Sequence, residues 1–128
     1  MSDEIKKGLL GIVVDETTIS QVMPDINSLT YRGYAVQDLC EKCSFEEVVH
    51  LFLFGALPNK GQLEELTAKL IANRSIPAEV KTYIANAPTD HPMATLRSGI
   101  SMLSGYLSDM ETLTEQSMKD NAIALVSK

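Results

Sequence analysis

The stretch from Asp90 to Leu107 constrains the fold more than any other part of the sequence. Pro92 suits the first turn of a helix, where its missing N–H and fixed φ cost nothing, and it keeps His91 out of the α region. Apolar residues then recur at steps of three and four, as on one side of a helix. They are Met93, Leu96, Ile100, Leu103 and Leu107. This spacing predicts a long helix that buries the apolar stripe at the centre of a helical protein.

A second stripe of the same helix consists only of small residues, at steps of four, three and four. They are Ala94, Ser98, Ser101 and Gly105. Small side chains let a second helix backbone approach closely, as is best documented between membrane helices. Arg97 makes this segment too polar to span a membrane. We therefore predict that the small stripe is a helix-packing surface, either within the chain or in a dimer.

The composition indicates one globular domain or a piece of a larger one. A chain of 128 residues buries about two thirds of its unfolded surface, and 45% hydrophobic residues exclude wholesale disorder. The net charge of −6, with eleven scattered basic residues, argues against nucleic acid as a partner. No apolar run is long enough for a membrane span. The first seven residues resemble neither a signal nor a transit peptide, so we expect a cytoplasmic location.

Residues 8–34 are predicted to form a small β-hairpin region. The β-branched residues of Ile12–Val14 and Thr17–Ile19 favour a first strand. Pro24 and Asp25 are typical of a turn, and Leu29–Tyr31 is the expected return strand. Such a hairpin is marginal alone and must pack on helices.

Capping signals predict a helical core over residues 35–107. Ser44, with a glutamate three residues later, forms a capping box before a helix that is apolar almost all round. Gly55 is typical of the residue that ends such a helix. Two more helices are expected, an amphipathic one capped by Asn59 and a short one opened by Pro77.

The last part of the chain is predicted to be an acidic loop, residues 108–116, followed by a helix over residues 117–128. Either Thr114 or Ser117 can cap this helix. It has no terminal Gly, Asn or Pro before Lys128, and its apolar face is incomplete. We therefore expect an unfinished helix, which belongs to a longer chain or needs a partner to cover it.

No catalytic, cofactor-binding or metal site is predicted. The glycines form neither a phosphate loop nor a dinucleotide motif, and no nucleophile elbow is present. Cys40 and Cys43 are spaced like a metal-binding pair, but only His50 and His91 remain to complete a zinc site; the alternative is two reduced thiols packed as small apolar groups at a helix end. We expect His50 to pack within its helix. Arg32 can bind an anion or form a structural ion pair.

Four stretches of the chain resemble, in order and spacing, the N-terminal part of citrate synthases, and together they cover nearly the whole sequence. The resemblance is to the shorter bacterial and archaeal forms, which include 2-methylcitrate synthases. The stretches are Gly8–Val14, Leu29–Tyr34, Phe45–Pro58 and His91–Met93. This resemblance implies a mainly α-helical portion of the family's large domain, with a small N-terminal β-hairpin.

The resemblance also implies a function. Family members condense an acyl-CoA, such as acetyl-CoA or propionyl-CoA, with oxaloacetate and work as homodimers. Residues 92–107 and 117–128 correspond to helices at the dimer interface. The family's catalytic histidines and aspartate, and its substrate-binding arginines, follow the matched region, so this chain alone is expected to be inactive. The alternative is a non-catalytic dimerisation module derived from that family.

His91 occupies a region that some larger relatives use for a regulatory nucleotide. The resemblance therefore leaves two roles open for His91, a regulatory site or the positioning of the helix start, of which we favour the second. No cofactor is expected in this chain, because the acyl-CoA of the family is a substrate.

Overall fold

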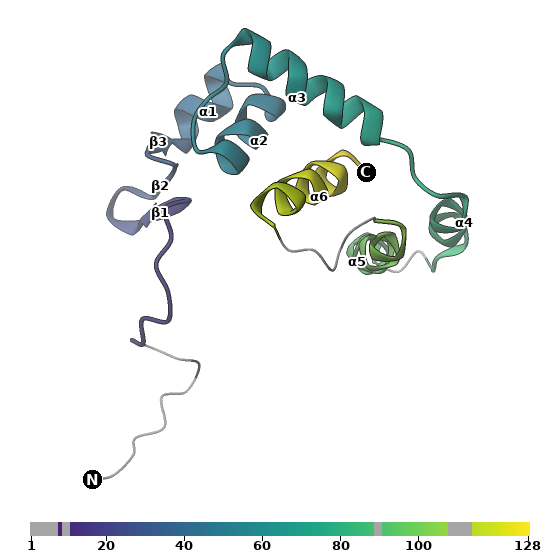
Figure 1. Ribbon diagram of the computed structural model, residues 1–128. Helices are drawn as coiled ribbons and strands as arrows, with labels where there is room; N and C mark the ends of the chain where they lie inside the picture. Colours follow the sequence, from purple (N-terminus) through teal and green to yellow (C-terminus); the bar gives the residue numbers. More distant parts are fainter. Residues whose placement is uncertain (1–7, 9–10, 89–90, 108–113) are drawn as a thin grey trace. The chain divides into compact units, whose positions relative to one another are not determined.

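The computed structural model describes residues 8, 11–88, 91–107 and 114–128. The chain divides into two compact units, an N-terminal unit of residues 1–56 and a C-terminal unit of residues 57–128. The described residues form six α-helices and one three-stranded antiparallel sheet (Figure 1). The predicted mainly α-helical fold with a small N-terminal hairpin is confirmed.

The sheet of the N-terminal unit contains β1 (Ser20–Met23), β2 (Ser28–Tyr31) and β3 (Tyr34–Ala35), in the order β1-β2-β3. A short 3-10 turn, η2 (Pro24–Ile26), joins the first two strands, and Asn27 completes it in the left-handed conformation. The register pairs Val22 with Leu29. The expected turn and return strand are therefore confirmed.

The first strand expected over Ile12–Val14 and Thr17–Ile19 is wrong, since both segments precede β1. These residues belong to no strand, and 84% of the surface of Val13 is exposed. The first strand, β1, begins at Ser20 instead. β-Branched residues fit a strand only where a partner strand and a packed face are available, and neither is present along this segment in the described residues.

Two helices complete the N-terminal unit, α1 (Val36–Lys42) and α2 (Phe45–Phe54). The capping box predicted at Ser44 is confirmed: Ser44 Oγ accepts from the N–H of Glu47 at 3.2 Å, and Glu47 Oε2 accepts from the N–H of Ser44 at 2.7 Å. Gly55 ends α2 with φ of 83°. Leu39 of α1 and Leu51 of α2 are buried, and Leu51 is fully inaccessible.

Arg32 ties the sheet to the end of α2. Its Nη2 donates to the carbonyl oxygen of Phe52 at 3.3 Å, and its Nη1 donates to Thr18 Oγ1 at 2.6 Å. The rings of Tyr31 and Phe52 lie beside this contact, with centroids 4.8 Å apart. A cation near the last carbonyl groups of a helix complements the helix dipole. Arg32 therefore joins these segments through neutral oxygens, and the ion pair expected for it is not among the salt bridges of the described residues.

The C-terminal unit contains α3 (Lys60–Asn73), α4 (Ala78–Asn86), α5 (Pro92–Leu103) and α6 (Glu115–Ser127), with a 3-10 turn, η3 (Ser104–Tyr106), after α5. Helix α3 packs on α6, and α4 packs on α5. The buried apolar side chains of this unit are Leu66, Leu70, Val80, Leu103, Ile123 and Ala124.

The predicted caps of this unit are confirmed at Asn59 for α3 and at Thr114 for α6. In the second case Ser117 is the third residue of the capping box rather than the cap itself. Helix α6 therefore begins at Glu115, two residues before the predicted start. The rest of the predicted acidic loop, residues 108–113, lies outside the described residues.

The long helix predicted to reach Leu107 ends at Leu103, and the prediction that it buries its apolar stripe is wrong for three of the five residues. Met93 is 61% exposed and Leu96 52% exposed, and Ile100 is exposed as well. The buried side of α5 is instead centred on Gly99 and Leu103. Because each residue turns a helix by about 100°, this side is the edge of the apolar stripe at Leu103, extended by Gly99. Helix α4 lies beside Gly99, where a built Cβ would be 4.0 Å from Ile84 Cγ1, an ordinary van der Waals contact.

Two glycine-to-alanine substitutions are expected to change stability in opposite directions. Gly99→Ala meets only ordinary van der Waals contact within a regular helix, so it is expected to raise the free energy of unfolding by about 0.5–1 kcal/mol. Gly55→Ala places a Cβ at φ of 83° and is expected to lower it by about 1 kcal/mol or more. Urea unfolding followed by circular dichroism measures both. A loss of stability in Gly99→Ala would contradict the described packing of α4 on α5.

Candidate interaction surface

An apolar groove crosses the C-terminal unit between α4, α5 and the end of α6. Its volume is about 270 Å³. Ile84 of α4, Leu96 and Ile100 of α5, and Leu125 and Val126 of α6 line it. Ile84 and Leu96 also line a second hollow beside Pro92, at the start of α5. Leu96 and Ile100 of the exposed apolar stripe therefore form a wall of the apolar groove, whereas Met93 lines neither hollow.

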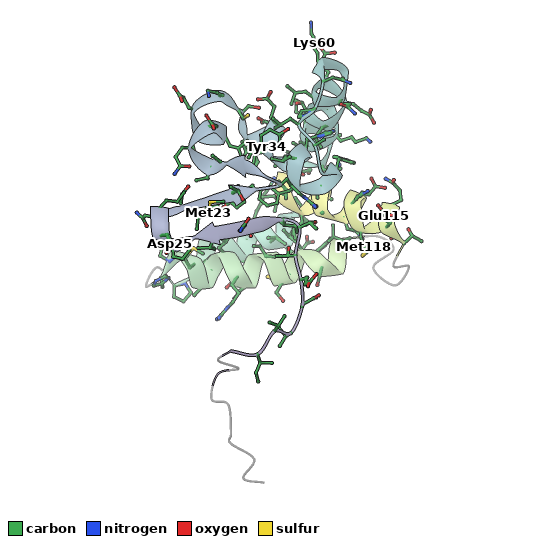
Figure 2. All side chains as sticks on the ribbon, turned by 90° about the vertical axis from the view of Figure 1, so that its left-hand side faces the viewer. Met23, Asp25, Tyr34, Lys60, Glu115 and Met118 are labelled. Atoms are coloured by element: carbon green, nitrogen blue, oxygen red, sulfur yellow. The ribbon has the colours of Figure 1, made fainter. Side chains whose placement is uncertain are left out.

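Helix α6 exposes apolar side chains as well. Ile123 and Ala124 are buried, whereas Met118, Leu125 and Val126 are exposed. Figure 2 shows Glu115 at the beginning of α6 and Met118 one turn further on. The helix thus buries one side in the unit and leaves a second apolar side open. In monomeric proteins, contiguous exposed apolar patches of this kind mark interaction sites.

The four small residues predicted as packing contacts lie elsewhere on α5 and η3. Ala94, Ser101 and Gly105 are exposed, and Ser98 is half-buried. None of the four lines the apolar groove. Helix α5 therefore presents two open surfaces, a groove wall on one side and the small stripe on the other. The sequence pattern indicated the stripe but not the groove, because the apolar stripe was expected inside the core.

Polar contacts hold this part of the unit together. Lys128 Nζ donates to the carbonyl oxygens of Asn73 at 3.0 Å and of Ser75 at 2.7 Å, which joins the end of α6 to the end of α3. At the beginning of α6, Lys119 Nζ donates a hydrogen bond to Glu115 Oε1. This hydrogen bond and the positive charge of Lys119 lower the pKa of Glu115. The Lys119–Glu115 pair lies on the surface, where such pairs contribute little to stability.

The two histidines singled out for chemistry belong to different units of the chain. His50 is buried, with Nδ1 2.8 Å from the carbonyl oxygen of Ala56. His91 is exposed in an extended conformation directly before α5, and its side chain makes no capping hydrogen bond. Within residues 8, 11–88, 91–107 and 114–128, no three or more His, Cys, Asp or Glu side chains are grouped as metal ligands would be. No helix in this described part is long and apolar enough to cross a lipid bilayer.

Comparison with known proteins identifies the family. The family model described as "Citrate synthase, C-terminal domain" matches residues 8–128. The chain belongs to the citrate synthase family. Among curated members, the 2-methylcitrate synthase 1 of Corynebacterium glutamicum is 48% identical over 111 residues, which cover 85% of this chain and 29% of that protein. The citrate synthase of Mycolicibacterium smegmatis is 48% identical over 100 residues, 77% of this chain and 26% of that protein.

The fold agrees with solved citrate synthases. The crystal structure of the Pyrobaculum aerophilum citrate synthase superposes with a TM-score of 0.85 at 27% identity. This match covers 97% of the chain and 33% of that structure. The chain thus spans about a third of the length of the citrate synthases that it matches. Its position in the N-terminal part of their large domain, implied by the resemblance, stays a prediction.

Proposed function

We propose that this chain supplies part of the helical scaffold of a citrate synthase-type enzyme. The whole enzyme condenses acetyl-CoA or propionyl-CoA with oxaloacetate in the cytoplasm. The support is the family match over residues 8–128 in a chain that spans about a third of its relatives. On this proposal the bond-making side chains belong to parts of the family fold that have no counterpart here, and the 128-residue chain alone is inactive.

The proposed contribution of the chain to the enzyme is self-association. Residues 92–107 and 117–128 would face a second copy, as the family resemblance implies. The apolar groove and the exposed side of α6 support this proposal, because both present apolar side chains to solvent in a single copy. Burial of such side chains in a dimer contributes about 25 cal/mol for each Å² of apolar surface that is removed from water.

The same exposed surface supports the second candidate, a non-catalytic dimerisation module. In that case the chain associates with itself or with a relative but has no place in catalysis. The two candidates agree on association and differ in whether the chain can substitute for the matching third of an active enzyme. A chimera therefore separates them.

The chimera carries residues 8–128 in place of the equivalent stretch of the C. glutamicum 2-methylcitrate synthase 1. If the chain is a catalytically compatible scaffold, the folded chimera is expected to release CoA from propionyl-CoA in the presence of oxaloacetate. The isolated 128-residue chain is expected to release none. Thiol release followed with a chromogenic disulfide measures both.

A control addresses the two histidines. The double variant His50→Asn and His91→Ala, made in the chimera, is expected to keep kcat within about threefold, because neither side chain is proposed to take part in chemistry. A folded chimera without activity would favour the dimerisation module. Turnover by the isolated chain would overturn the proposal that the catalytic groups lie elsewhere.

A further inference from the structure

Cys40 and Cys43 lie together at the end of α1, in the N-terminal unit. Cys40 is exposed in the last turn of the helix, and Cys43 directly follows it and is half-buried. The N–H of Cys43 donates to the carbonyl oxygen of Leu39 at 3.0 Å, so the helical path continues to the Cα atom of Cys43. Helix geometry then places the two Cα atoms about 5 Å apart, which is inside the range that a disulfide spans.

The two cysteines occupy positions three apart at the helix end, which are neighbours on a helix surface. Cys43 is the C-cap and leaves the helix in an extended conformation, with φ of −117° and ψ of 147°. Both thiols are free in the structure. The exposure of Cys40 differs from the expected packing of both thiols as small apolar groups. Two sulfurs suffice for a disulfide, whereas a structural zinc ion takes four ligands.

We propose that Cys40 and Cys43 form a reversible dithiol–disulfide site whose partner is a low-molecular-weight disulfide such as oxidised glutathione. The thiolate of Cys40 attacks one sulfur of oxidised glutathione, and one glutathione thiolate leaves. The thiolate of Cys43 then attacks the Cys40 sulfur of the mixed disulfide, and the second glutathione thiolate leaves. The two cysteines thereby lose two electrons and two protons, and one oxidised glutathione is reduced to two glutathione molecules.

Mass spectrometry of the intact chain after incubation with oxidised glutathione tests this site. The wild-type chain is expected to lose both free thiols, to become lighter by two hydrogen atoms and to retain no glutathione. Dithiothreitol is expected to restore both thiols. The variant Cys43→Ser lacks the second sulfur and is expected to accumulate one glutathione on Cys40.

A matched control keeps two thiols but moves one of them. The double variant Glu41→Cys and Cys43→Ser places the thiols at neighbouring positions, which do not face each other on a helix. It is expected to carry glutathione adducts rather than to close, while its circular dichroism matches that of the wild type. Wild-type chains that retain glutathione, that cross-link between copies, or that keep both thiols free would each overturn the proposal.

Discussion

Leu51→Ala is expected to lower the free energy of unfolding of the N-terminal unit by about 3 kcal/mol, because leucine-to-alanine changes in well-packed cores cost about 2–5 kcal/mol. Leu51 lies in the middle of α2 and has no accessible surface. Its removal leaves a cavity beneath the helix that Arg32 and Tyr31 join to the sheet. The expected loss is a large fraction of the stability of a small domain.

Hydrogen exchange of the α2 amides in the native state measures this change for the N-terminal unit separately. Phe45→Ala is the matched control, since it removes a larger side chain from the same helix at a position that is 65% exposed. It is expected to cost less than about 1 kcal/mol. Equal effects of the two substitutions would contradict the described burial of α2.

The second large effect is expected at the groove on α5. Leu96→Asp places a charge on a groove wall, and if a second copy covers this wall, the carboxylate loses its hydration on association without gaining a partner. We expect it to weaken self-association by at least about tenfold, equivalent to about 1.4 kcal/mol. Leu96 is 52% exposed in the single chain, so the fold itself is expected to tolerate the change.

Two further variants make this test specific. Ile71→Asp puts the same charge on α3, at a side chain that is 56% exposed and outside the groove, and it is expected to leave association unchanged. Gly105→Leu tests the small stripe, since a Cβ there meets no atom within 4 Å. Gly105→Leu is expected to weaken self-association if the small stripe contacts the second copy. Equal weakening by Leu96→Asp and Ile71→Asp would contradict a groove-specific interface.

The helix ends could be predicted from the sequence because their causes are local. The caps at Ser44, Asn59 and Thr114 each depend on residues within a single turn, and Gly55 ends α2 through its own backbone preference. The first strand and the buried side of α5 depend on what packs against them. No pattern within residues 12–14 says whether a partner strand exists, and only the approach of α4 makes Gly99 the buried centre of α5.

The candidate surface could be predicted only in part, for the same reason. The small stripe from Ala94 to Gly105 is visible as a pattern, and its residues are indeed open apart from the half-buried Ser98. The groove is assembled from three helices that are distant in the sequence. An apolar stripe such as that of Met93, Leu96 and Ile100 has the same spacing whether it fills a core or lines a docking surface.

Sedimentation velocity of the unmodified 128-residue chain, measured across the micromolar range, tests the central claim most directly. The claim is that this scaffold leaves the apolar surface of α5 and α6 open for a second copy. We expect a sedimentation coefficient that rises with concentration from that of a monomer to that of a dimer. A single monomeric species at every concentration would contradict it.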